Sequence, residues 1–375
     1  MACRSRPVQG AAMGLNVSRY AARLMRKRSL EIDGSHGEGG GQLVRTAVAL
    51  AAVTGTRLLL RNIRARRAPP GLAPQHLAAV RAVAALCGAQ CQGLELRADS
   101  FEFVPSELIA GDFTFDIGTA GSITLVLQAL LPVMIRAPQP CRVRIIGGTD
   151  VRAAPPIDYF IHVLLPLLSR TGAKPLCSLR RRGYYPRGGG IVELAAARTA
   201  LTPLRLPAPG RLLTLEGLVH VANLPAHILD RMSQAAVARL HALEAPVTIE
   251  RVVLQAPVAL GQGGAVALWA RTQHSVLGAT RVAERGVRAE TLGEAAAAEL
   301  ATEIESGASI DLHAADQILI YAALAGAGSD FTARTVSPHA ETAMWLIEQF
   351  LPVRFRITDL AGHKRVETVA GAQVQ

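Results

Sequence analysis

A threefold internal repeat constrains the fold of this chain more than any other feature of its sequence. Each copy contains a turn that opens an apolar helix and then a Pro-marked turn that opens a second helix. Short β-like runs such as LLLRNI, FTFDI and VRFRI alternate with these helices. Strands interleaved with helices predict an α/β fold built from repeated units. The paired turns begin at Gly37 and Pro69, at Gly118 and Pro155, and at His313 and Ser337.

The spacing of the Pro-marked turns predicts an insertion between the second and third copies. The first interval covers residues 70–156, whereas the second covers residues 156–338 and is longer by about 100 residues. This excess is enough for a smaller α/β domain. The predicted parts are a disordered basic tail at residues 1–29, a larger domain of three repeats at residues 30–208 and 309–369, and the smaller domain at residues 209–308.

The tail accounts for most of the formal net charge of +11. Residues 1–28 contain Lys27 and six arginines but no acidic residue. The overall basicity is therefore weak evidence that the folded part binds nucleic acid. The tail could be an RNA-binding arm, a targeting segment or an artefact of translation, and it lacks the apolar core of a signal peptide.

Composition favours a folded protein outside the membrane. Half of the residues are apolar and 18% are charged, which excludes a disordered chain. The longest uncharged stretch, residues 117–135, has a polar N-terminal half and predicts a buried helix rather than a membrane span. The five cysteines include no Cys-x-x-Cys pair, so we expect reduced thiols and a cytoplasmic location.

The first candidate site is the glycine-rich turn GEGGGQLVR at residues 37–45. A turn that enters a helix leaves free N–H groups at the positive end of the helix dipole, which suits phosphate. A tight turn without a ligand would explain the glycines equally well. Glu38 could hold Mg²⁺ and Arg45 could face a bound phosphate, so these two residues favour the ligand site.

Two further segments could contact phosphate. Four arginines within residues 61–67 precede Pro-Pro-Gly, and arginines on a stiff loop would lose little entropy on binding. A solvated strand end is the alternative for these arginines. The segment RGYYPRGGG at residues 182–190 either permits close approach of a ligand or forms a hairpin turn.

His339 is the candidate nucleophile. It follows Pro338, which favours the start of a helix. The positive end of a helix disfavours imidazolium, so the ring would be neutral at pH 7, and the same helix end would stabilise a phosphate. One histidine among ten is more often a surface or core residue, so the sequence context has to outweigh that interpretation.

Seven segments in a fixed order carry a resemblance to a known family: GEGGGQLVR, RARRAPPGLAPQH, GTAGSITLVLQALLP, GGTDVRAAPPIDYF, RGYYPRGGG, ADQILIYAALAGAG and SPH. Together they make residues 30–367 resemble the RNA 3′-terminal phosphate cyclase family. The resemblance implies three βαβαββ units in a large domain, with a smaller α/β domain inserted before the third unit. It also implies an enzyme that uses ATP to convert the 3′-terminal phosphate of RNA into a 2′,3′-cyclic phosphate. The family reaction proceeds through a covalent histidyl-AMP and then an RNA-adenylate.

The resemblance also implies roles for individual residues of this chain. His339 matches the adenylated nucleophile, and Glu38 matches the ligand of a single Mg²⁺ or Mn²⁺ ion. His313 stands at a position that is often aromatic in the family and stacks on adenine. The residues matching phosphate and transfer roles are Arg45, Arg64, Arg67 and Gln75, and those matching nucleotide contacts are Gln128, Pro155, Tyr159, Asp316 and Gln317.

Two other interpretations compete with this one. A cyclase-like branch of the family is non-catalytic, acts in ribosome assembly and lacks the catalytic histidine, whereas His339, Glu38, Arg64 and Arg67 are all present here. Enolpyruvyl transferases use a similar repeated unit, but a shared fold does not determine function. The expected partners are ATP and an RNA with a 3′-phosphate end, without a membrane, and the sequence indicates no oligomeric state.

Overall fold

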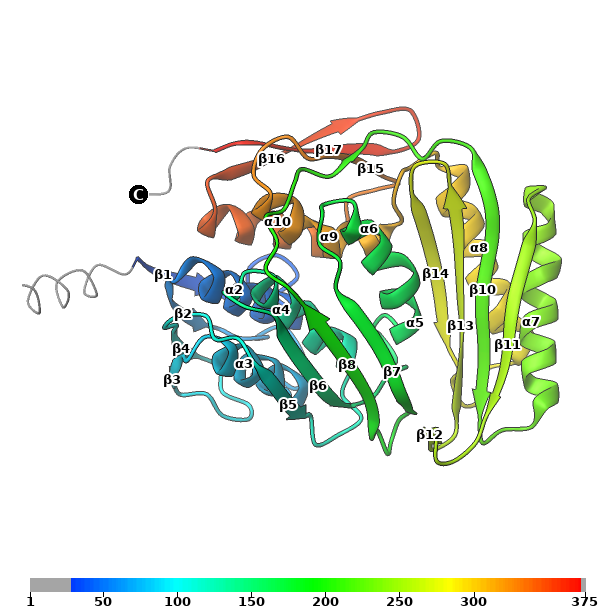
Figure 1. Cartoon of the computed structure of the whole chain (residues 1–375), viewed down its shortest axis with the longest axis horizontal. Helices are drawn as coiled ribbons and strands as arrows, with labels where there is room; N and C mark the ends of the chain where they lie inside the picture. The colour runs from blue at the N-terminus through cyan, green and yellow to red at the C-terminus, as the bar shows by residue number, and fades with distance from the viewer. Residues whose placement is uncertain (1–27, 372–375) are drawn as a thin grey trace, which may run out of the picture.

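The computed structural model describes residues 28–371, so the predicted tail lies outside the described residues except for its last two positions. Strands and helices alternate along the described residues, and the predicted α/β class is confirmed. The strands form four sheets, three of which share one strand order (Figure 1). Among the helices of residues 28–371, none is long and apolar enough to cross a membrane.

The first sheet and its helices come from residues 29–104. They are β1 (Ser29–Asp33), α2 (Gly41–Thr54), β2 (Arg57–Arg61), α3 (Pro74–Leu86), β3 (Gln90–Gln92) and β4 (Phe101–Val104). The strand order is β1-β2-β4-β3, with β1 parallel to β2 and the other pairs antiparallel. A parallel pair needs a crossover connection, which α2 supplies. α2 ends where Gly55 takes the left-handed conformation with φ of 69°.

The second sheet repeats this order and these strand directions. Its elements are β5 (Asp112–Asp116), α4 (Ile123–Met134), β6 (Cys141–Gly147), α5 (Ile157–Tyr159), α6 (Leu165–Ser169), β7 (Leu176–Gly183) and β8 (Gly190–Ala196), and a π-helical turn joins α5 to α6. The order is β5-β6-β8-β7. Nearly all side chains of α4 are buried, so the long uncharged stretch contains a buried helix, as predicted.

The third sheet has the same order again, β9-β15-β17-β16. Its elements are β9 (Arg205–Leu206), α9 (Leu312–Leu324), β15 (Asp330–Ala333), α10 (Pro338–Phe350), β16 (Val353–Asp359) and β17 (Lys364–Ala370). β9 and β15 are parallel although about 125 residues separate them, because the fourth sheet lies between them in the sequence. Helices α2, α4, α9 and α10 contact one another, so helices from all three units meet in one shared core.

The fourth sheet forms one end of the molecule in Figure 1, with α7 and α8 covering one of its faces. Its elements are β10 (Leu212–Ala222), α7 (Ala226–Leu240), β11 (Val247–Leu254), β13 (Gly263–Thr272), β14 (Val276–Val282) and α8 (Ala289–Glu305), in the strand order β11-β10-β13-β14. It has a hydrophobic cluster of its own, which includes Val219, Met232 and Leu300. The short strand β12 (Ala259–Leu260) instead pairs with β7. These elements fall within residues 209–308, and the division into two domains stays a prediction.

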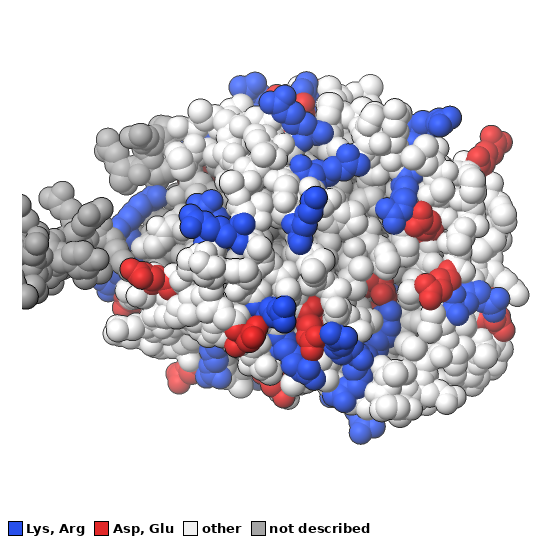
Figure 2. All heavy atoms as spheres, in the orientation of Figure 1, with Lys and Arg blue, Asp and Glu red and all other residues white. Residues whose placement is uncertain are grey.

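Charged side chains are spread over the face of the molecule drawn in Figure 2 rather than gathered in one basic patch. In the lower half of that view, basic and acidic side chains lie next to one another. Ion pairs among the described residues include those of Glu193 with Arg144 and Arg180. The surface of this face therefore gives no strong electrostatic sign of nucleic acid, as the charge distribution along the sequence also indicated.

Candidate active site

His339 lies in the first turn of α10. Pro338 is the first helical residue, and the Ser337 hydroxyl caps the helix by accepting the N–H of Ala340 at 2.9 Å. The predicted helix start is confirmed. The His339 side chain is 47% exposed, so a reactant can reach the ring at the positive end of the helix dipole.

Glu38 lies between His339 and Arg67. One of its carboxylate oxygens pairs with Nδ1 of His339, and the other pairs with the Arg67 guanidinium. The Glu38 N–H donates to the Thr342 hydroxyl at 3.1 Å, and that hydroxyl donates to the Pro338 carbonyl at 2.7 Å. A loop of the first unit is thus joined to a helix of the third. With Nδ1 engaged, Nε2 of His339 is the ring nitrogen left to act as a nucleophile.

Glycines allow this loop to approach its neighbours. Gly37 has φ of 57°, and a Cβ atom on it would lie 2.3 Å from Oγ1 of Thr342. A Cβ atom on Gly41 would lie 2.0 Å from Nε2 of His76. A larger residue would push the loop away from α10 or α3. The N-cap residue of α2, Gly40, has no side chain to cap the helix, so the first N–H groups of α2 can bind an anion.

Arg64 and Arg67 lie on the loop between β2 and α3. The Arg64 guanidinium donates to the carbonyl groups of Pro69 at 3.0 Å and Gly71 at 2.9 Å. Burial and the nearby charge of Arg67 lower the pKa of Arg64. The loop therefore anchors Arg64 through its own backbone, while Arg67 extends to Glu38.

A pocket between α2, α4, α9 and α10 collects polar residues from all three units: Arg45, Gln128, Asp316 and Gln317. Gln128 Nε2 donates to Gln317 Oε1 at 2.7 Å, and Gln317 Nε2 donates to the His313 carbonyl at 2.9 Å. Arg45 is buried, which lowers its pKa to about 10 and still leaves it charged at neutral pH. The structure thus brings together four residues predicted to contact phosphate or nucleotide.

Asp316 connects this pocket to the helix of His339. The Ser337 hydroxyl, which caps α10, donates its hydrogen to the Asp316 carboxylate. Burial raises the pKa of Asp316, and the Ser337 hydrogen bond acts in the opposite direction. Asp316 therefore links the pocket to the start of α10.

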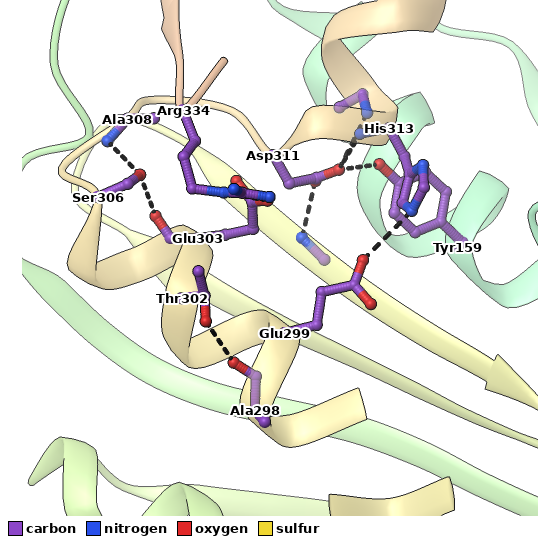
Figure 3. Close-up of polar contacts among 12 residues, drawn as sticks. Tyr159, Ala298, Glu299, Thr302, Glu303, Ser306, Ala308, Asp311, His313 and Arg334 are labelled. Carbon is purple, nitrogen blue, oxygen red and sulfur yellow. Dashed lines mark hydrogen bonds and ion pairs between the residues drawn. The ribbon is translucent and has the colours of Figure 1, made fainter. Parts of the chain in front are cut away.

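Tyr159 and His313 meet edge to face beside Asp311 (Figure 3). Their ring centroids lie 6.4 Å apart at an interplanar angle of 86°. Tyr159 is buried, and its hydroxyl donates to Asp311 at 2.6 Å. The carbonyl of Pro155 accepts a hydrogen bond from the Thr124 hydroxyl at 2.7 Å. His313, whose side chain is 49% exposed, is the ring of this pair that a ligand can reach, and Tyr159 supports it.

Gln75 lies in the first turn of α3, beside the loop that precedes α4. A Cβ atom added to Gly121 of that loop would lie 3.2 Å from Cβ of Gln75. Its neighbour His76 has no role assigned from the sequence. Burial, together with the charges of Arg45 and Arg64, lowers the pKa of His76 to about 3. His76 is therefore a neutral spacer between α2 and α3. The only sequence signal that pointed to His76 was its position next to Gln75.

The segment RGYYPRGGG forms the hairpin between β7 and β8. Arg182 is buried and pairs with Asp150 at 3.2 Å and with Asp158 at 2.8 Å. His220 of β10 lies 3.8 Å from each of these two carboxylates. Among residues 28–371, Asp150, Asp158 and His220 are the one group of three potential metal ligands, but the Arg182 guanidinium already balances part of their charge. This segment connects the second unit to the fourth sheet.

The donor groups near His339 fit a divalent cation that is bound together with a nucleotide. Glu38 borders a pocket that also includes Glu341 and Thr342. Mg²⁺ is usually held by one or two carboxylates together with water and phosphate oxygens. Glu38 can provide such a carboxylate if its contact with Arg67 or His339 is exchanged for the ion.

Comparisons with known proteins agree on one similarity. A profile described as RNA 3′-terminal phosphate cyclase matches residues 36–357. The RNA 3′-terminal phosphate cyclase of Nitrosospira multiformis is 53% identical over 337 residues, which cover 90% of this chain and 95% of that protein. The one of Ignicoccus hospitalis is 43% identical over 327 residues, covering 86% and 93%.

One solved structure that matches this chain is the enolpyruvyl transferase NikO of Streptomyces tendae, with a TM-score of 0.36 and 11% sequence identity. It covers 91% of this chain and 49% of that chain. A likeness this weak supports no functional argument.

Proposed function

The chain belongs to the RNA 3′-terminal phosphate cyclase family, and from this premise we propose that it uses ATP to convert the 3′-terminal phosphate of RNA into a 2′,3′-cyclic phosphate. The observation that carries the proposal is the contact between Glu38 and Nδ1 of His339 at the start of α10. It provides a histidine that is oriented, accessible and placed at a helix end that stabilises phosphate. The coarser assignment to this class of ligase follows from the family.

In the first step, Nε2 of His339 forms a bond to the α-phosphorus of ATP, and the bond from that phosphorus to pyrophosphate breaks. The product is a covalent histidyl-AMP, and pyrophosphate leaves. Glu38 offsets the positive charge that develops on the imidazole, because its carboxylate holds the Nδ1 proton. Buried Arg45 supplies positive charge to the phosphates from the pocket side.

In the second step, an oxygen of the RNA 3′-phosphate attacks the phosphorus of histidyl-AMP, and the bond to His339 breaks. The neighbouring 2′-hydroxyl then attacks the activated 3′-phosphorus and loses its proton, and AMP leaves. Ring closure gains from the proximity of the two groups on one ribose. Arg64, Arg67 and Gln75 belong to the first unit and would bind the RNA phosphate.

Glu38 would hold a Mg²⁺ or Mn²⁺ ion, which when bound neutralises charge on the departing pyrophosphate. Gln128, Asp316 and Gln317, which line one pocket, would contact the nucleotide, with Pro155, Tyr159 and His313 toward the base. We also propose a cytoplasmic location, on the cysteine pattern alone.

Labelling with ATP that carries a radioactive α-phosphate tests the first step. We expect a labelled protein that is stable in base and labile in acid, as a phosphoramidate is, and His339→Ala should remove the label. A label that persists in His339→Ala contradicts the proposal.

The second test uses an RNA oligomer with a 3′-phosphate, whose end should become resistant to phosphatase. The rival interpretation, a non-catalytic cyclase-like protein, predicts neither the label nor the resistant end.

A further inference from the structure

Helix α8, which covers the fourth sheet, presents two carboxylates to the third unit (Figure 3). Glu299 Oε1 lies 3.3 Å from Nε2 of His313, and Glu303 pairs with Arg334 at 3.0 Å. Glu299 also pairs with Arg281 of β14. The inserted segment therefore contacts the first turn of α9, which borders the pocket of Asp316 and Gln317.

Several charged groups face His313 from the elements packed around it. Glu299 approaches His313 from α8, and Asp311 and Asp316 flank His313 on the α9 side. Tyr159 lies against the His313 ring. The hydrogen bond with Glu299, outweighing burial, raises the pKa of His313 to about 9. The pKa of Glu299 is lowered, because its hydrogen bonds with His313 and Arg281 outweigh its burial. His313 is therefore positively charged at neutral pH.

We propose that Glu299 is a positioning residue for the nucleotide, which holds His313 as a cationic ring one helical turn before the pocket residue Gln317. The inference rests on the proposed function. The His313 carbonyl accepts the Gln317 amide, so the ring and the polar pocket belong to one helical turn. A cation attracts the π face of a purine more strongly than a neutral ring does. Through Glu299, the inserted segment thus influences the affinity for ATP.

The decisive variant is Glu299→Gln, which keeps the shape of the side chain and removes its charge. The probe is an ATP analogue with a methylene group between the α and β phosphates, which binds but cannot transfer AMP. Calorimetric titrations between pH 7.5 and 10 avoid titration of the phosphates, whose second pKa is about 6. We expect wild-type affinity to fall as the pH rises through about 9.

For Glu299→Gln we expect a flat profile that is about 3- to 30-fold weaker than wild type at pH 7.5 and equal to it at pH 10. His313→Phe keeps an aromatic face and should also lose the pH dependence, which separates His313 from any other titrating group. Glu305→Gln is the matched control, because Glu305 is exposed on the same helix. It should behave as wild type.

A wild-type profile that is flat, or one that Glu299→Gln leaves unchanged, overturns the inference. Glu299→Gln could instead bind more weakly at every pH while its affinity still falls with a midpoint near pH 9. That result would also overturn the inference, because it would assign the loss of affinity to structural damage. The proposed function is tested separately, and it fails if wild-type protein forms no labelled histidine. Binding of the methylene analogue does not report on that step, because the analogue cannot transfer AMP.

Discussion

At the residue scale, the proposed chemistry depends on one carboxylate that contacts two basic side chains. Glu38 pairs with His339 and Arg67, although it lies 304 positions from Thr342, which binds its backbone. The contact selects the ring nitrogen that stays free for attack. It also explains why Glu38 lies among glycines, because residues with side chains at those positions would prevent the loop from approaching α10 so closely.

Glu38→Gln should therefore slow formation of the histidyl-AMP label by about 10- to 100-fold, the range seen when a group that orients a metal-ligating histidine is removed. Single-turnover labelling measures the rate. Glu341→Gln is the comparison, since Glu341 is a second carboxylate bordering the same pocket and belongs to α10. Equal effects of the two substitutions would show that local negative charge, and not the contact with His339, matters.

Also at the residue scale, Gly41 leaves room for the buried ring of His76. Gly41→Ala should lower the free energy of unfolding by about 1–3 kcal/mol, as overpacking does in a closed core. Gly40→Ala should be tolerated for folding, because a Cβ atom there would meet its nearest neighbour at 3.7 Å. Urea denaturation measures both. A Gly41→Ala protein as stable as Gly40→Ala would contradict the packing argument.

At the element scale, the start of α10 is fixed by its cap. Ser337 accepts the Ala340 N–H and donates to Asp316, so one hydroxyl joins α9 and α10. Ser122 caps α4 in the same way by accepting the Leu125 N–H at 3.3 Å. The two caps offer a matched comparison, because only one of them precedes His339.

Ser337→Ala and Ser122→Ala should each lower the free energy of unfolding by about 1 kcal/mol, the usual contribution of a cap. Only Ser337→Ala should also slow histidyl-AMP formation, since it frees Asp316 and loosens the turn that carries His339. The paired measurements are chemical denaturation and labelling. An equal loss of labelling in both variants would assign the effect to stability alone.

At the scale of the whole molecule, three sheets with one strand order surround a shared core of helices, and the fourth sheet contacts this core through β13 and β14. Glu299 of α8 adds an ion pair with His313 at the same junction. The contact of Glu299 with His313 makes this junction sensitive to pH. The pKa of His313 rises from 6.5 to about 9 in the folded protein, so the folded state binds the additional proton. Stabilisation by this contact is fully present below pH 6.5 and is lost as the pH rises through about 9.

The unfolding temperature should therefore fall more between pH 7 and 10 in wild type than in Glu299→Gln. Differential scanning calorimetry at fixed ionic strength measures the fall, and Glu305→Gln again serves as the control. Parallel declines in wild type and Glu299→Gln would show that the contact adds nothing to stability across this junction.

Much of the fold could be predicted because its signals are local. The turn that starts α10 at Pro338 and the buried helix α4 follow from patterns within a few residues. The long interval between the second and third repeats also indicated where an insertion lies. Contacts between units could not be predicted in this way. Neither the sequence around Glu38 nor the sequence around His339 indicates that these two residues contact each other.

The sequence by itself determined the class of the fold, the helix that presents His339 and the family, since these depend on local periodicity, caps and ordered motifs. Only the tertiary structure decided that Glu38 meets His339, that His76 is buried and that Glu299 meets His313. The reason is physical. Such contacts join residues of different units, and they form only when the packing of helices in one core brings those units together.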